Sequence, residues 1–494
     1  MAEERGSVSY EKVDTSYFEQ RGLRRYAGVW SLWALGVGAV ISGDFFGWSF
    51  GLAAGGTVGM LIALVIITVM YAGLCYSIAE MSPALPHTGG AYSFARSAMG
   101  PWGGYVTGLA ENMEYVLTPA VIVVGIGSYL SAIFETPKEW APMWWLFAYA
   151  LFVGLNVWGV ELSFRFTVVI TFLALAILGV FYVGAITKLD FGRYALDVPV
   201  EPGGTFVLPR GGKGVFGALP FAIWFYLAIE QLPLAAEEAH DPKRDMPKGI
   251  LLGLLTLVIC AFLTLILSVG LAPGAAELGK TDAPLFASLR AVYGLGAGSK
   301  ILALVAVAGL VASFHSIIFA YGRQIYSLSR AGYFPRMLSV TGSRKTPHVA
   351  LLVGAVLGYA VAYAIHLLGS DSPVGAVLLN MAVFGAVIAY ALQMASFILL
   401  RLRLPNLERP YRSPLGISGA VVAMVIALVT LIALFLDDGY RPAVIGAAIW
   451  FLLGLVYFAV WGRRHLVYAP EEAFAQQALA QEALAVETPP TGGS

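Results

Sequence analysis

The sequence is poor in charged residues and in cysteine. Asp, Glu, Lys and Arg make up 12% of its 494 residues, whereas roughly a quarter is usual in a soluble domain. The two cysteines, Cys75 and Cys260, both lie inside apolar runs, which argues against a disulfide framework and against a metal site. The first 26 residues are polar and charged and contain no apolar segment, so we expect no cleavable signal peptide.

Motifs of the common enzyme classes are also missing. The sequence contains no zinc-protease motif, phosphate-binding loop, serine elbow or cysteine–histidine pair. We therefore predict no enzymatic activity, no cofactor and no metal. The net charge of zero says nothing about partners, because the charges are segregated by loop, and we expect no nucleic-acid partner.

Apolar residues dominate instead, at 59% of the chain, with a mean hydropathy of +0.77. They form blocks of about 20 or more residues, the length that an α-helix needs to cross the hydrocarbon core. We predict an all-α polytopic membrane protein, surrounded by membrane lipids, with twelve transmembrane helices. They are expected at residues 27–54, 57–81, 101–131, 142–160, 165–187, 214–236, 248–272, 298–325, 348–369, 374–400, 416–436 and 442–462.

The distribution of basic residues predicts the orientation in the membrane. With these spans, 21 of the 30 Lys and Arg residues fall on the side of the N-terminus. Positive charge accumulates in cytoplasmic loops, so we expect a multi-pass protein of the plasma (inner) membrane with both termini in the cytoplasm.

Two spans are interrupted by residues that do not suit a membrane helix. The first contains AVISGDFFGWSFG, with a break near Gly43, and the sixth breaks at Ala228–Glu230, about 185 residues later. Spans 1–5 and 6–10 are therefore predicted to form an inverted five-plus-five repeat, and paired broken helices indicate the binding site of a transporter. The predicted parts are an N-terminal cytoplasmic segment (1–26), a first repeat (27–187), an extracellular loop (188–213), a second repeat (214–402), helices 11 and 12 (403–464), and a cytoplasmic tail (465–494) that we expect to be a short amphipathic helix followed by disorder.

The break in the first span offers both backbone and charge. Around Ile41, Ser42 and Gly43 the chain can leave the helix, and unwound backbone at this depth lines a cavity. The start of the second half-helix favours an anion such as a substrate carboxylate. Asp44 would repel a carboxylate and attract an amine. Alternatively, Asp44 caps the second half-helix.

Span 3 carries a polar stripe at helical spacing. Glu111, Glu114 or Tyr115, and Thr118 lie on one face. A charge near the bilayer centre costs at least about 2.5–3.5 kcal/mol, so it usually faces a cavity or a partner. Glu114 is deeper and is the better amine ligand, unless it is a protonated glutamate hydrogen-bonded between helices. Glu111 is expected to be solvated or paired with an arginine, Arg165 or Arg323.

Span 6 adds aromatic residues and a third mid-depth carboxylate. Trp224 and Tyr226 precede the break, and aromatic faces attract ammonium groups by about 0.5–2 kcal/mol. Each is as readily explained by packing. Glu230 follows the break at Ala228 and either contacts the substrate or acts as a gating or proton-sensing group.

Span 8 supplies candidates for ion coupling. His315 lies near mid-depth and could titrate during transport. The alternative is a core histidine bonded to a neighbouring helix. Ser313 and Ser316 flank it and offer hydroxyl groups.

Together these segments resemble the amino acid–polyamine–organocation transporter superfamily. The resemblance rests on ISGDFFG in span 1, AEMSPALPHTGGAYSFARSAMGPWGGYVTG before span 3, AIEQLPLAAEEAHDPKRDMPKGI after span 6 and SRAGYFPRMLSVTGSRKTPHVA after span 8. VISGDFFGWSFGLAAGG and GLAENMEYVLTPAVIVVGIGSYL look most like ethanolamine permeases.

The resemblance implies alternating access and a substrate site between spans 1, 3, 6, 8 and 10. Ser42 and Gly43 match the superfamily's glycine-rich break, and Glu230 matches the glutamate after its span 6 break. Ala228 stands where the superfamily usually has glycine. Sodium-coupled relatives use span 1 carbonyls with span 8 hydroxyls, so proton and sodium both remain possible coupling ions.

These observations predict a permease that imports a small organic amine such as ethanolamine, with its ammonium between Asp44 and Glu114 and with proton coupling preferred. One alternative is an amino-acid or polyamine transporter or exchanger of the same superfamily, in which the carboxylates gate or carry protons. Another is a transporter-like nutrient sensor.

Overall fold

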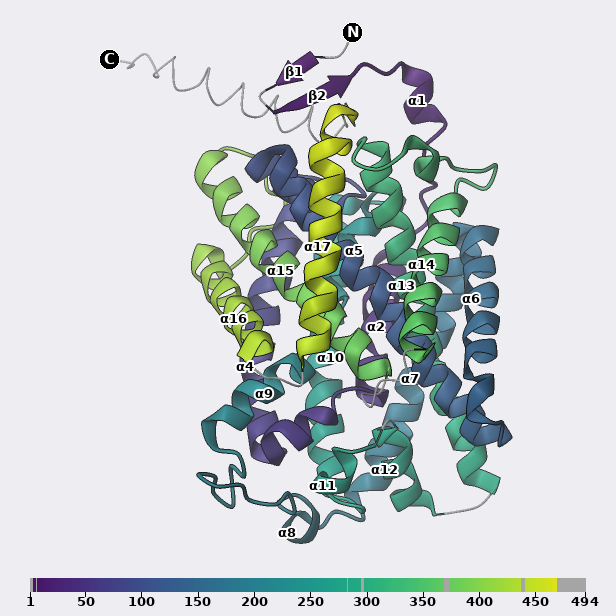
Figure 1. The fold of residues 1–494 in the computed structure, drawn as a ribbon, viewed down its shortest axis with the longest axis vertical. Helices are drawn as coiled ribbons and strands as arrows, with labels where there is room; N and C mark the ends of the chain where they lie inside the picture. The colour runs from purple at the N-terminus through teal and green to yellow at the C-terminus, as the bar shows by residue number, and fades with distance from the viewer. Residues whose placement is uncertain are drawn as a thin grey trace.

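The computed structural model is a bundle of long helices (Figure 1). It describes residues 3–5, 7–281, 283–294, 297–367, 374–436 and 440–468. The amphipathic helix and disorder predicted for the tail fall mostly on residues 469–494, which lie outside the described residues. The helical, polytopic character predicted from the sequence is confirmed.

Nine helices within the described ranges are long and apolar enough to cross a membrane. Each coincides with a predicted span, although α4 and α5 extend beyond theirs through non-helical turns at Gly56 and Gly100. The remaining predicted spans fall on the two interrupted segments and on α13 (Ala297–Arg330). The count of twelve spans therefore stays a prediction. The nine helices are α4 (Phe50–Ala84), α5 (Gly90–Phe134), α6 (Ala141–Trp158), α7 (Val160–Ile186), α10 (Pro242–Val269), α14 (His348–Leu367), α15 (Val374–Arg403), α16 (Gly416–Leu436) and α17 (Arg441–Val460).

The first interruption lies where the sequence predicts it. Helix α2 (Val29–Val40) ends at Ile41, one short turn forms α3 (Ser42–Phe45), and the chain becomes helical again at Phe50. All four residues of α3 are buried. The unwound segment therefore lies inside the protein, as required for backbone that is not fully hydrogen-bonded within its own helix at membrane depth.

The second interruption is also confirmed. Helix α9 (Gly211–Ile223) ends before Trp224, and the 3₁₀ segment η2 (Ile229–Glu238) follows Ala228. Ala228 has φ +81°, a left-handed conformation that suits the glycine usual at such a position.

The two breaks touch each other. A Cβ atom added to Gly43 would collide with the backbone carbonyl of Trp224. Gly43 therefore permits the close approach of the two broken segments, a packing role that the sequence analysis did not anticipate.

Helix α5 occupies a central place in the bundle, with α13, α14, α15 and α6 packed along it. Its contact with α15 is especially close, because a Cβ atom on Gly385 would lie 2.6 Å from the Ala110 carbonyl oxygen and 2.9 Å from the Glu114 amide nitrogen. Helix α2 packs against α7, α10 and α13, and η2 contacts α2, α4, α5 and α13. This arrangement brings α2, α5, η2 and α13 together around the two breaks.

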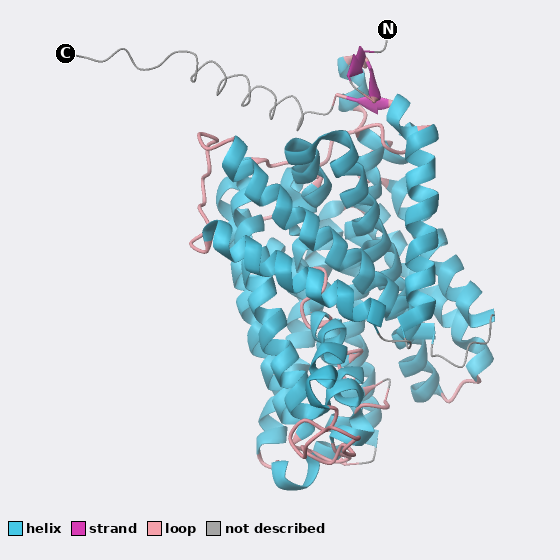
Figure 2. Ribbon diagram, turned by 60° about the vertical axis from the view of Figure 1, so that its left-hand side comes forward, coloured by secondary structure: helices cyan, strands magenta, loops and turns pink. Residues whose placement is uncertain are grey.

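Short elements tie the ends of the chain together. Strand β1 (Glu3–Arg5) pairs antiparallel with β2 (Val8–Glu11), which pairs in parallel with β3 (Leu466–Val467). The sheet lies at one end of the bundle, next to the end of α17 (Figures 1 and 2). Residue 3 and residue 468 therefore lie on the same side. The sequence analysis predicted no strands. Other short elements are α1 (Thr15–Glu19), η1 (Lys138–Trp140), α8 (Phe191–Tyr194), α11 (Ala275–Leu278), α12 (Pro284–Tyr293), η3 (Arg336–Ser339) and η5 (Gly462–Arg464).

Candidate functional site

Two carboxyl groups meet at the centre of the bundle. Glu114 of α5 is fully buried and Glu230 of η2 is 2% exposed. Their side chains are close enough to share a hydrogen bond. We call these two residues the carboxyl pair. A hydrogen bond between two carboxyl groups requires a proton on one of them, and two bare carboxylates would repel. The pair therefore holds a proton or a cation.

Tyrosines from three helices surround the carboxyl pair. The Tyr390 hydroxyl of α15 donates to Glu114 Oε1 at 3.2 Å, and the Tyr115 hydroxyl of α5 donates to Glu230 Oε1 at 3.3 Å. Tyr71 of α4 donates to the Tyr390 hydroxyl at 3.0 Å, and the rings of these two residues lie edge to face. Carboxylates combined with aromatic rings form a suitable environment for an ammonium group.

The remaining oxygens of the carboxyl pair have no donor. Neither Glu114 Oε2 nor Glu230 Oε2 has a hydrogen-bond partner other than the facing carboxyl among the described residues. No Lys or Arg in the described ranges forms an ion pair with either glutamate. These orphaned acceptors can receive the N–H groups of a bound cation.

Two of the tyrosines at this site, Tyr71 and Tyr390, were not predicted from the sequence. The chain has 24 tyrosines, so tyrosine in an apolar span is too common to identify a site. Tyr390 could have been found because it lies in span 10, which the resemblance places at the substrate site. For Tyr71, on span 2, no such signal existed.

Asp44 lies apart from the carboxyl pair. It is fully buried, and neither of its carboxylate oxygens accepts a hydrogen bond from the described residues. The groups near it are the Thr264 hydroxyl and Cys260 of α10 and Tyr182 of α7. The neighbours of Asp44 differ from those of Glu114, and the ammonium position predicted between these two acids stays a prediction.

The alternative role of Asp44 as a helix cap is wrong. Helix α4 begins at Phe50 and its N-cap residue is Ser49. Asp44 itself lies inside α3, where its amide donates to the Ile41 carbonyl at 3.1 Å.

The two predicted aromatic residues of span 6, Tyr226 and Trp224, have different surroundings. Tyr226 interacts electrostatically with Asp44, bonds to the Thr68 hydroxyl at 2.7 Å, and packs against the ring of Tyr71 at 5.1 Å. Trp224 is buried with an unpartnered indole nitrogen and lies against Gly47. Tyr226 thus extends the tyrosine cluster toward Asp44.

The freed backbone of the first span is bonded to α13. Ser313 Oγ accepts the Ser42 amide at 2.9 Å and donates to the Gly38 carbonyl at 2.8 Å. The Ser316 hydroxyl is buried beside Gly38 without a partner. The span 1 carbonyl and span 8 hydroxyls named from the resemblance are therefore adjacent, with Ser313 bridging the break.

Thr118 and His315, two other predicted residues, have ordinary partners. Thr118 donates to the carbonyl of Glu114 one turn earlier. His315 is buried between Asn156, at 3.1 Å from its Nδ1, and Ser163, at 2.9 Å from its Nε2. This is the arrangement expected for a core histidine bonded to neighbouring helices.

Glu111 accepts a hydrogen bond from Gln324 Nε2 at 2.7 Å. The predicted pairing of Glu111 with Arg165 or Arg323 is wrong, because these arginines pair with Glu161 and Glu238. Sequence alone does not show which faces of α5 and α13 oppose each other.

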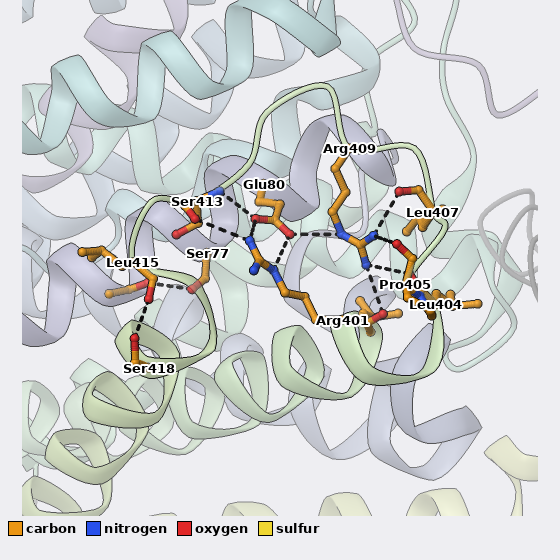
Figure 3. Close-up of polar contacts among 12 residues, drawn as sticks. Ser77, Glu80, Arg401, Leu404, Pro405, Leu407, Arg409, Ser413, Leu415 and Ser418 are labelled. Atoms are coloured by element: carbon orange, nitrogen blue, oxygen red, sulfur yellow. Dashed lines mark hydrogen bonds and ion pairs between the residues drawn. The ribbon is translucent and has the colours of Figure 1, made fainter.

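Two other buried acids, Glu80 and Glu238, are neutralised by arginine. Figure 3 shows Glu80 of α4 between Arg401 and Arg409, with N···O distances of 2.6 and 3.1 Å. The backbone amide of Ser413 also donates to Glu80 at 2.7 Å. We call this group the Glu80 cluster; it joins the end of α4 to the segment between α15 and α16.

The broken helices and the buried polar site between them define a membrane transporter. Within the described ranges, no group of three or more His, Cys, Asp or Glu residues could hold a metal ion. The chain belongs to the amino acid permease family, whose sequence model matches residues 32–469. It is therefore a secondary transporter of amino acids or related small solutes, not an enzyme, and membership of this family implies a LeuT-like fold.

Three relatives have named substrates. The branched-chain amino acid permease BcaP of Bacillus subtilis (strain 168) is 26% identical over 477 residues, covering 90% of this chain and 95% of the relative. The D-serine/D-alanine/glycine transporter of Escherichia coli (strain K12) is 24% identical, covering 75% and 80%. The methylthioribose transporter of Bacillus subtilis (strain 168) is 24% identical, covering 90% and 95%. These names favour the amino-acid alternative over ethanolamine.

Proposed function

We propose that this permease carries a small solute with an ammonium group and that Glu114 and Glu230 bind that group. The observation that carries the proposal is the buried carboxyl pair. It has unpartnered oxygens, it forms no ion pair with a Lys or Arg among the described residues, and tyrosines surround it. An ammonium donates three hydrogen bonds and would replace the proton held between the glutamates. Because the proton and the ammonium would occupy the pair in turn, this arrangement supports coupling by exchange of substrate for a proton.

A small neutral amino acid is the first candidate substrate. The named relatives that carry amino acids support it. Its carboxylate would turn toward the break in the first span, where the Ser42 amide now bonds to Ser313. Rotation of the Ser313 hydroxyl would free that amide for the substrate.

Ethanolamine is the second candidate. Asp44 favours it, because a buried negative charge two residues from Ser42 disfavours a carboxylate at the break. Ethanolamine would use the same carboxyl pair and present only a hydroxyl group to the broken backbone.

A ligand panel tests these candidates. Purified transporter is exposed to alanine, leucine, ethanolamine, choline, putrescine and methylthioribose, and thermal stabilisation and radiotracer uptake are measured. Binding of alanine or leucine alone supports the first candidate, and binding of ethanolamine without the amino acids supports the second. Binding of methylthioribose with no response to any primary amine would refute the assignment of the carboxyl pair.

We propose that both termini lie in the cytoplasm, as the distribution of basic residues indicates. We also propose that the chain is divided into the segments that the sequence predicts. The pairing of β2 with β3 supports a common side for the two ends. Labelling of single cysteines introduced at Ser7 and at Thr205, in intact and permeabilised cells, tests the orientation. Modification of Ser7→Cys in intact cells would contradict it.

A further inference from the structure

A second polar site lies at the end of the bundle that carries α1. A pocket of ≈ 430 Å³ opens where the turn between α6 and α7 meets the residues just before α2 and the loop before α14. Its walls include Arg24 from the residues before α2, Arg165 from α7 and Arg344 from the loop before α14. The carboxyl pair and the breaks do not contribute to it.

The pocket has an excess of positive charge. Glu161 is the one acid on its wall, and it lies 2.7 Å from Arg165 and 3.9 Å from Arg24. The side chains of these two arginines are 68% and 63% exposed. Arg344 donates to the Trp158 carbonyl at 3.0 Å and lies over its ring. Three guanidinium groups against one carboxylate suit a phosphate, whose oxygens match the planar arginine fork.

The start of α7 adds backbone donors to the same wall. This 27-residue helix begins at Val160, and its N-cap residue Gly159 provides no side-chain cap. The first N–H groups of an uncapped helix attract anions, because they lack partners and carry the positive end of the helix dipole. Val160 and Leu162 line the pocket at this helix start.

The apolar surface next to the pocket indicates where the phosphate comes from. Trp158 is 62% exposed and Leu162 is 41% exposed, and Val169 continues an exposed apolar face along α7. Tryptophan is enriched at membrane–water interfaces. The pocket therefore opens beside a surface that membrane lipid covers, and a lipid whose phosphate sits among the arginines would lay its acyl chains along this face.

We propose that this pocket binds the phosphate headgroup of an anionic membrane lipid. Arginine pockets at the membrane interface are suited to such headgroups. The lipid would link Arg24, five residues before α2, to α7 and to the α14 loop, and thereby hold the broken first span against its neighbours. Bound lipid is expected to raise the thermal stability of the transporter.

Native mass spectrometry and thermal denaturation in nanodiscs test the proposal. Wild-type protein and the double variant Arg24→Gln/Arg344→Gln are compared in phosphatidylcholine with and without phosphatidylglycerol, and Arg412→Gln, an exposed arginine outside the pocket, is the matched control. The double variant should retain phosphatidylglycerol about 10–30-fold less well and lose its stabilisation, while the control behaves as wild type. Glu161→Gln should bind it more tightly.

Two results would overturn the proposal. Equal retention of phosphatidylglycerol by wild type and double variant would remove the pocket as its site. Equal stabilisation by inorganic phosphate or glycerophosphate would show a soluble anion in place of a lipid. Because binding is measured without substrate, either result leaves the proposed role of the carboxyl pair untouched.

Discussion

The carboxyl pair and the Glu80 cluster place acids of similar burial in opposite electrostatic surroundings. Glu80 is 1% exposed and is bonded by two arginines and a backbone amide. Glu114 and Glu230 are equally buried, but among the described residues their side chains contact only each other and neutral tyrosine hydroxyls. A buried charge with complete pairing stabilises one arrangement of helices, whereas a buried acid without a cation is costly and is retained for a ligand or a proton.

The largest expected effect is on folding, at the Glu80 cluster. Glu80→Gln removes the charge that neutralises Arg401 and Arg409, and breaking a buried ion pair from one side costs about 3–5 kcal/mol. Thermal or denaturant unfolding of the purified protein measures the loss. Glu408→Gln is the control, because Glu408 forms an exposed pair with Lys243 worth about 0–1 kcal/mol. Equal losses of stability in the two variants would show that the Glu80 cluster does not stabilise the fold.

The second effect is on binding, at the carboxyl pair. Glu230→Gln keeps the shape of the side chain and its bonds to Glu114 and Tyr115, but it removes one negative charge from the ammonium site. We expect unfolding close to that of wild type and affinity for the amine substrate lowered by about 10–100-fold, the value of a charge-assisted hydrogen bond. Isothermal titration of the ligand found in the panel measures it. Severe destabilisation with unchanged affinity would show that Glu230 has a structural role, like Glu80, and does not bind the substrate.

A smaller effect is expected in the tyrosines around the pair. Tyr390→Phe deletes the donor to Glu114 and leaves the ring in place. The loss of one hydrogen bond of about 1 kcal/mol corresponds to about fivefold in affinity. The control is Tyr359→Phe, whose hydroxyl bonds to the Pro142 carbonyl away from the pair. Equal affinities of the two variants would exclude Tyr390 from the binding site.

The buried acids of the carboxyl pair and the breaks in the two spans could be predicted from the sequence. A carboxylate in the middle of an apolar span is visible without a structure, since its insertion cost is independent of the fold. Glu114 and Glu230 were selected on that ground, and both breaks were located by glycine, proline and polar residues. The spans agree with the helices because the apolar length required by the bilayer is a property of the chain.

The residues that these acids contact could not be predicted from the sequence. Which glutamate faces which depends on the rotation of each helix about its axis, so Glu114 was assigned to Asp44 when it lies against Glu230. Arg401 reaches Glu80 from the last turn of α15, and Arg409 reaches it through the fold of the segment between α15 and α16, which carries no periodic signal. The strands β1–β3 are two to four residues long, too short for an alternating pattern.

A variant of Asp44 tests whether every buried acid without a Lys or Arg partner belongs to the substrate site. It is as buried as Glu114 and has even fewer partners, yet it faces α10 and α7. Since it is not part of the carboxyl pair, Asp44→Asn should change substrate affinity by less than about fivefold, under 1 kcal/mol, in the same titration. Stability should stay equal or rise, because an amide is cheaper to bury than an unpaired charge. A loss of affinity as large as that of Glu230→Gln would instead make Asp44 an amine ligand, reached when the helices rearrange during transport.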